Sequence, residues 1–177
     1  SSNHIMSHLI GLYNANNISA AITIVKYFEV ADIDIKIAIE VFVPENNRSQ
    51  LLHKNTNEVI LDAYNANPSS MAVAIDNFIQ LDKANKIVIL GDMFELGQES
   101  LAEHKTIVNL LLKEINITCY FMGKDFYCNR MVNNHFHIDE TFEDFSVAMK
   151  EDKLENKMIL IKGSRGMALE RTLDFLT

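Results

Sequence analysis

The sequence contains little of what holds small or unusual folds together. Its 177 residues include two cysteines, two prolines, six glycines and no tryptophan. Cys119 and Cys128 have no CxxC pair and no histidine cluster beside them, so we expect reduced thiols rather than a disulfide framework or a zinc site. The few prolines and glycines exclude a collagen-like or low-complexity chain. A chain of this length can bury enough apolar surface to fold without covalent staples.

Positive charge and long apolar runs are scarce as well. There are 16 Lys and Arg against 24 Asp and Glu, which gives a formal net charge of −8. Nucleic acid requires a basic face, so we expect no nucleic-acid partner, although a local cluster could bind a small anion. No run is long enough for a transmembrane helix, and no cleavable signal pattern opens the sequence. We therefore expect a cytoplasmic protein without membrane insertion.

Short apolar runs alternate with stretches of helical spacing through most of the chain. The runs cover residues 59–61, 87–90, 119–122 and 158–161, with 136–138 as a further short strand. The predicted helices cover residues 69–81, 101–115, 124–133, 142–151 and 166–176. Such alternation is typical of a mostly parallel sheet with helices on both faces. The sequence therefore predicts a Rossmann-like α/β domain over residues 44–177.

Residues 1–43 are predicted to form a separate unit. Residues 14–28 carry an apolar stripe with helical spacing. Residues 31–42 are ambiguous, because their isoleucines alternate as in a strand, while Ile33 and Ile37 also share a helical face that Asp32 could cap. Since a proline disfavours helix in the residue before it, we place the boundary at Val43-Pro44.

The segment VILDAYNANPSSM, residues 59–71, is the most informative part of the chain. An apolar run stops at Asp62, a polar stretch containing Asn65 follows, and Pro68 opens a helical segment. Ligands bind at this end of a strand in open α/β sheets. An ionised carboxylate only accepts hydrogen bonds, so Asp62 suits the two hydroxyls of a ribose. Asn67, before Pro68, is predicted to cap the helix.

Three more polar residues are candidates for binding a nucleotide. Asn14 and Asn17 are three positions apart, so at a helix start they would share a face and could offer amides to a base or a phosphate. The alternative is that one of them caps the helix. Arg48, in Asn46-Asn47-Arg48, could stack on a base or pair with a phosphate, unless it is simply a solvated surface arginine.

The loop LGDMFELG, residues 90–97, also follows an apolar run. Its carboxylates, Asp92 and Glu95, could meet a cationic group such as an amine. His104, in the following helix, could point back toward them; the alternative is a surface histidine.

A third loop, KGSRGM, follows the last apolar run. Lys162, Ser164 and Arg165 lie among glycines at a predicted helix start, which favours an anion such as a phosphate or a carboxylate. The sequence contains no GxxxxGK[ST], so this loop is not a P-loop. Three such loops at one edge of a sheet favour a real site over three unrelated turns.

The words GLYNANN, NNR, DAYNANPSSM, LGDMFELG and KGSRGMALE occur in the order and approximate spacing of the Mur ligases. From Gly11 to its last helix the chain resembles this family, and most closely the branch that adds D-alanyl-D-alanine. The family has a UDP-sugar domain, a central ATPase with a P-loop and a C-terminal Rossmann-like domain. The resemblance implies that this chain is the third domain, preceded by the last helices of the second, and it favours helix for residues 31–42.

The resemblance also implies an ATP-dependent reaction. The tripeptide carboxylate of UDP-N-acetylmuramoyl-tripeptide is phosphorylated, and the amine of D-alanyl-D-alanine then attacks the acyl phosphate. The residues that match the ATP site are Asn14, Asn17, Arg48, Asp62, Tyr64 and Asn65. Those that match the dipeptide side are Asp92, Glu95, His104, Lys162, Ser164 and Arg165.

The catalytic centre is expected outside these 177 residues. ATP and Mg²⁺ would serve the full-length enzyme, whose P-loop, Mg²⁺ ligands and modified lysine belong upstream, so we expect no catalytic or metal-binding residue here. The chain alone would be an inactive, weakly nucleotide-binding monomer that closes about a hinge near Val43-Pro44. The alternatives are a folylpolyglutamate- or cyanophycin-type ligase domain, or a stand-alone α/β module that binds a nucleotide or dipeptide without chemistry.

Overall fold

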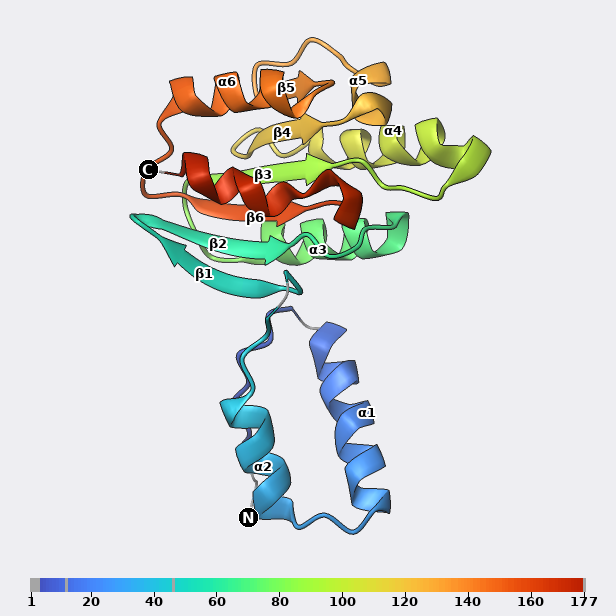
Figure 1. The fold of residues 1–177 in the computed structure, drawn as a ribbon, viewed down its shortest axis with the longest axis vertical. Coiled ribbons are helices and arrows are strands. Elements are labelled where there is room, and N and C mark those ends of the chain that lie inside the picture. The colour runs from blue at the N-terminus through green and yellow to red at the C-terminus, as the bar shows by residue number, and fades with distance from the viewer. Residues whose placement is uncertain (1–3, 12, 46, 177) are drawn as a thin grey trace.

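A computed structural model describes residues 4–11, 13–45 and 47–176. Leu12 and Asn46, which belong to two of the predicted motifs, lie outside this part. The described chain contains a six-stranded sheet in the order β1-β2-β6-β3-β4-β5 (Figure 1). The strands are β1 Gln50–Lys54, β2 Asn57–Asp62, β3 Lys86–Gly91, β4 Thr118–Met122, β5 Phe136–Asp139 and β6 Met158–Lys162. β1 pairs with β2 antiparallel, and the other neighbours are parallel.

Helices cover both faces of the sheet, which confirms the predicted fold class. One face packs against α3 Pro68–Gln80, α4 Ser100–Leu111 and α5 Lys124–Cys128, and the other against α6 Phe142–Asp152 and the 3₁₀ helix η3 Leu169–Phe175. The central strands β3 and β6 consist almost entirely of buried residues. Both of their faces meet helices, so their sequences read as continuous apolar runs rather than as alternating ones.

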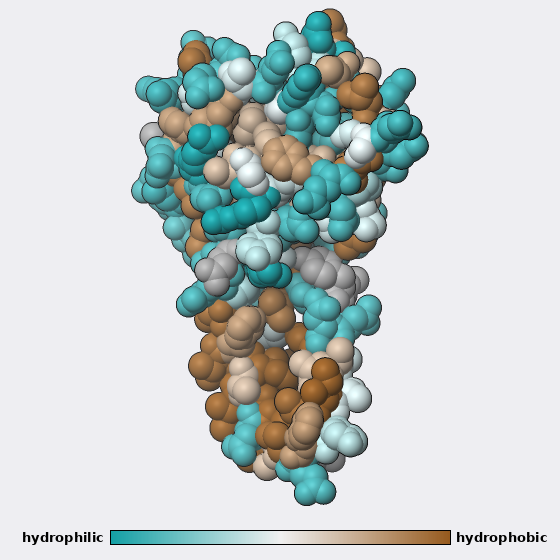
Figure 2. Space-filling view, turned by 45° about the vertical axis from the view of Figure 1, so that its right-hand side comes forward, coloured by the Kyte–Doolittle hydropathy of each residue, from teal (hydrophilic) through white to brown (hydrophobic). Residues whose placement is uncertain are grey.

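The helices α1 Tyr13–Tyr27 and α2 Asp32–Val41 form a hairpin that projects away from the sheet (Figure 1). Figure 2 shows that much of the hairpin surface is hydrophobic. The large apolar side chains exposed on the hairpin include Ile24, Tyr27, Phe28, Ile33, Ile37 and Val41. Among the described residues, no helix has the length and apolar character needed to cross a bilayer.

The structure corrects several local predictions. The helix predicted over 101–115 ends at Leu111. Within residues 31–42 the chain forms the helix Asp32–Val41; its N-cap is Ala31, and Asp32 is its first helical residue. The strand β1 was not predicted. The helix predicted over 124–133 ends at Cys128. The helix predicted over 166–176 is replaced by the 3₁₀ helices η2 Arg165–Met167 and η3, because Ala168 between them adopts the left-handed conformation with φ 49°.

Candidate functional site

The six residues that the resemblance assigns to an ATP site line one cavity. It has a volume of about 630 Å³ and lies between the hairpin and the end of β2. The predicted residues in its wall are Asn14, Asn17, Arg48, Asp62, Tyr64 and Asn65, and Lys162 joins them. A second cavity of about 450 Å³, lined mainly by apolar side chains, shares Asn14, Ser49 and Asp62 with the first. Residues far apart in sequence thus meet at the carboxyl end of the sheet, where α/β folds bind ligands.

Asp62, the last residue of β2, is held at both carboxylate oxygens. Oδ1 accepts a hydrogen bond from the backbone N–H of Ser49 at 3.1 Å. Oδ2 accepts one from Nζ of Lys162 at 2.6 Å. Each oxygen has a second lone pair, so the carboxylate can still accept hydrogen bonds from a ligand such as a diol.

Asn14 and Asn17 share a face of α1, as their spacing predicted. Nδ2 of Asn17 donates to Oδ1 of Asn14 at 2.9 Å, and Nδ2 of Asn14 donates to the carbonyl of Ile10 at 2.7 Å. Since α1 begins at Tyr13, neither asparagine is its N-cap. Asn14 is buried, and its bonds tie the segment before α1 to the cavity wall.

Arg48 stacks on Tyr64 at the rim of the same cavity. The guanidinium carbon lies 3.7 Å from the centre of the tyrosine ring, and both side chains are exposed to solvent. A cation over an aromatic face at this distance is electrostatically favourable. The pair therefore presents a flat, positively charged surface beside Asp62.

The loop after β2 ends in the predicted helix cap. Oδ1 of Asn67 accepts the N–H of Ser70 at 2.8 Å, while the Ser70 hydroxyl accepts the N–H of Asn67 at 3.2 Å. This capping box, with Pro68 at the first helical position, confirms the prediction for Asn67. Within the loop, Oδ1 of Asn65 accepts the N–H of Ala66 at 2.9 Å.

The loops after β3 and β6 are joined to each other. The N–H of Ser164 donates to the carbonyl of Asp92 at 3.1 Å, and the N–H of Phe94 donates to the Ser164 hydroxyl at 2.8 Å. Ser164 is buried, whereas Arg165 is exposed and pairs with Glu170 at 3.3 Å. Glu95 is exposed and has φ 66°. Of the predicted dipeptide-side residues on these two loops, Asp92 and Ser164 are thus bonded to each other at adjacent strand ends.

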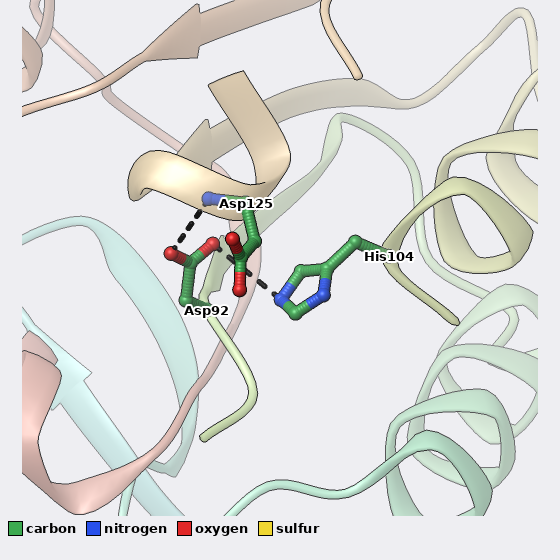
Figure 3. Close-up of side chains that lie close together, drawn as sticks. All are labelled: Asp92, His104 and Asp125. Atoms are coloured by element: carbon green, nitrogen blue, oxygen red, sulfur yellow. Dashed lines mark hydrogen bonds and ion pairs between the residues drawn. The ribbon is translucent and has the colours of Figure 1, made fainter. Parts of the chain in front are cut away.

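Asp92, His104 and Asp125 form a compact cluster beneath these loops (Figure 3). Oδ2 and Oδ1 of Asp92 accept the backbone N–H groups of Asp125 and Phe126, each at 3.0 Å. Burial raises the pKa of the Asp92 carboxyl, while these two hydrogen bonds act in the opposite direction. Asp92 therefore anchors the first turn of α5 to the end of β3.

His104 is fully buried, so the alternative of a surface histidine is wrong. Its Nε2 accepts the N–H of Met93 at 2.9 Å, and its Nδ1 lies 2.7 Å from the carbonyl of Ser100. A carbonyl only accepts, so the ring proton is on Nδ1 and the imidazole is neutral. Nε2 also lies 3.5 Å from Oδ1 of Asp92.

These three residues hold the loop after β3 against α4 and α5. The candidate ligand atoms already have protein partners, including Oδ2 of Asp125, which accepts the Ser100 hydroxyl at 2.6 Å. Because Nε2 of His104 has a single lone pair, a cation bound there would have to displace the N–H of Met93. Direct contact of Asp92 or His104 with a dipeptide stays a prediction.

Several contacts at the site had no signal in the sequence. Ser49 acts through its backbone N–H, which no residue type reveals. Phe94 lies over Gly166, where an added Cβ would approach its ring to 2.6 Å. Lys162 was predicted to act with Ser164 and Arg165, but its ammonium group lies against Asp62 in the first cavity.

Comparisons with known proteins identify the family. The family model "Mur ligase, glutamate ligase domain" matches residues 47–165. The UDP-N-acetylmuramoyl-tripeptide–D-alanyl-D-alanine ligase of Bacillus subtilis is 31% identical, over 95% of this chain and 38% of its own length.

Solved structures share the fold. The corresponding ligase from Acinetobacter baumannii superposes with a TM-score of 0.80 at 24% identity, over 94% of this chain and 36% of the other. The MurF ligase of Thermotoga maritima, in complex with ADP, gives 0.73 at 18% identity, over 90% and 36%. This chain thus spans 36% to 38% of the length of these three proteins. The family match, which covers all six strands, and the 31% identity to the B. subtilis ligase show that the chain belongs to the Mur ligase family, of which it contains the glutamate ligase domain.

Proposed function

We propose that this chain is the C-terminal part of an ATP-dependent ligase that joins D-alanyl-D-alanine to UDP-N-acetylmuramoyl-tripeptide in peptidoglycan synthesis. The observation that carries the proposal is the cavity in which Asn14, Arg48, Asp62 and Tyr64 meet. The name of the B. subtilis relative supports the choice of substrates. In such a ligase, ATP activates the tripeptide carboxylate as an acyl phosphate, which the dipeptide amine then attacks.

The residues of this chain would bind and orient rather than react. Asp62 would accept hydrogen bonds from the ribose hydroxyls, and the Arg48–Tyr64 pair offers a flat cationic surface for the rest of the nucleotide. The amides of Asn14 and Asn17 lie across the cavity. On the neighbouring loops, Arg165 suits the dipeptide carboxylate and Glu95 its ammonium group, since both are exposed there.

We further propose that residues 1–43 belong to the preceding ATPase domain and residues 44–177 to the C-terminal domain. The exposed apolar side chains of α1 and α2 support this division, because a patch of that kind normally packs against another part of a protein. The P-loop and the Mg²⁺ ligands would lie in that other part. The nucleotide site would then be shared between two domains that close upon each other about the hinge near Val43-Pro44.

Kinetics of the full-length enzyme test the ribose assignment. Asp62→Ala should raise the KM for ATP more than the KM for D-alanyl-D-alanine, because the carboxylate lines the cavity that we propose for the nucleotide. Glu58→Ala is the matched control, since Glu58 lies at the other end of β2 in an exposed pair with Lys83. Equal effects of Asp62→Ala on both KM values would count against the assignment.

Calorimetry of this chain alone tests the shared site. If half of the ATP site lies in another domain, the 177-residue chain should bind ATP weakly and should not hydrolyse it. Micromolar affinity in an isothermal titration would contradict the shared site and favour a stand-alone binding module. The same titration with D-alanyl-D-alanine reports on the loops after β3 and β6.

A further inference from the structure

The side chain of Lys162 points into the cavity beside Asp62, away from Ser164 and Arg165 of the same loop. Lys162 ends β6 directly opposite Asp62 in the neighbouring parallel strand β2. Its Nζ donates to Oδ2 of Asp62 at 2.6 Å and to the carbonyl of Asn65 at 3.2 Å. The side chain of Lys162 is 3% exposed, and that of Asp62 is 18% exposed.

Because the ammonium group of Lys162 is buried, it depends on hydrogen bonds to Asp62 and Asn65 in place of water. A charge removed from water is tolerated when it is paired and hydrogen-bonded, and two of the three ammonium protons already bond Asp62 and the loop after β2. With 3% of its side chain exposed, Lys162 presents almost no surface from which its third ammonium proton could reach a dipeptide carboxylate. Arg165, by contrast, has a side chain that is 60% exposed and available to solvent.

We propose that Lys162 is a positioning residue of the nucleotide cavity, which fixes the Asp62 carboxylate for a ribose diol, and that it is not a dipeptide ligand. The inference rests on the proposed function and refines one of its sites. With Ser49 holding one oxygen and Lys162 the other, Asp62 is fixed in one orientation before a ligand arrives. Such preorganisation favours a ligand with two adjacent hydroxyls over the same ligand without them.

The ion pair itself can be tested without any ligand. The side-chain ammonium groups of isotope-labelled chain are observed by NMR, and the hydrogen exchange of Lys162 is compared with that of Lys83. Lys83 pairs with Glu58 at 2.8 Å on the same strand, but both side chains are exposed. The Lys162 ammonium should exchange at least about tenfold more slowly, and Asp62→Asn should accelerate it. Exchange as fast as that of Lys83 would overturn the proposal.

The positioning role requires a comparison of two nucleosides. Adenosine and 2′,3′-dideoxyadenosine are titrated into the chain and followed by backbone amide NMR. The wild type should prefer adenosine, and Lys162→Met should reduce that preference by about tenfold while leaving the dideoxy affinity unchanged. A merely structural defect would weaken both nucleosides equally. Lys83→Met, which removes the exposed ion pair, should keep the preference.

The outcomes separate this inference from the proposed function. A wild-type chain that binds both nucleosides equally would disprove the ribose role of Asp62. A wild-type preference that Lys162→Met preserves would leave that role intact and overturn the role of Lys162. If Lys162→Met does not fold, Lys162→Gln, which keeps a donor without the charge, replaces it. If Lys162→Gln loses D-alanyl-D-alanine binding and keeps the adenosine preference, Lys162 is a dipeptide ligand and the proposal is wrong.

Discussion

The backbone N–H of Met93 donates to Nε2 of His104 at 2.9 Å, and this bond ties the loop after β3 to the side of α4. His104 is fully buried, so replacing it with leucine would leave that N–H without an acceptor. An unsatisfied buried donor costs about 1–3 kcal/mol. We expect His104→Leu to lower the free energy of unfolding, measured in urea, by about this amount. His135→Leu, at an exposed position, should change it by less than about 0.5 kcal/mol; equal losses would contradict the assignment.

Asp92 should give the protein a specific pH dependence. Burial raises the pKa of its carboxyl above the ordinary value of 3.8, against the effect of two backbone N–H groups. The folded protein therefore holds this proton more tightly than the unfolded chain does. The resulting stability is fully present below the unfolded pKa and is lost as the pH rises through the folded pKa.

The variant Asp92→Asn removes this titration. The free energy of unfolding of the variant minus that of the wild type should therefore rise with pH above about pH 3.8 and then level off. Urea unfolding of both proteins across the acidic range gives the difference directly. A difference that stays flat or falls with increasing pH would show that the pKa of Asp92 is not raised in the folded protein.

The sequence predicted those helices and strands whose burial or capping produces a distinct local pattern of residues. Strands β3 and β6 are buried on both faces, so their apolar runs stand out, and the Asn67-Pro68 pair marks the start of α3. Residues 31–42 satisfy the helical and the strand pattern equally, so packing beside α1 decides. β1 was missed because its half-buried residues lie at the edge of the sheet and resemble a loop.

The sequence predicted which residues line the cavity, but not the hydrogen bonds between them. Six residues identified by motif do line one cavity. Asp62, Tyr64 and Asn65 stand at the carboxyl end of β2, where a site is expected, whereas Asn14 and Asn17 reach the cavity from α1 and Arg48 from the segment before β1. The pairing of Lys162 with Asp62 depends on strand order, since β6 lies beside β2 although 100 residues separate the two. The sequence pattern contains no information on that order, so Lys162 was grouped with its neighbours in the chain.

The two cysteines should react very differently. Cys119 is buried in β4, and burial raises the pKa of its thiol to about 12, whereas Cys128 is exposed at the end of α5. Because the thiolate is the reactive form, one thiol per chain should react with Ellman's reagent under native conditions and two after unfolding. Cys128→Ser should abolish the native reaction. Rapid reaction of both thiols in the folded wild type would mean that β4 is not protected.

Gly123 should tolerate a side chain much less well than Gly97 does. It precedes α5 with φ 132°, and an added Cβ would lie 2.3–2.6 Å from the carboxylate atoms of Asp92. Gly123→Ala would strain the backbone and displace the carboxylate that holds α5, so we expect a loss of about 3 kcal/mol or more in the free energy of unfolding. Gly97 provides the matched control: its φ is 57°, but a Cβ there meets nothing within 4 Å. Gly97→Ala should therefore cost only the left-handed strain of about 1–2 kcal/mol. Similar losses in the two variants would show that the contact with Asp92 contributes nothing beyond backbone conformation.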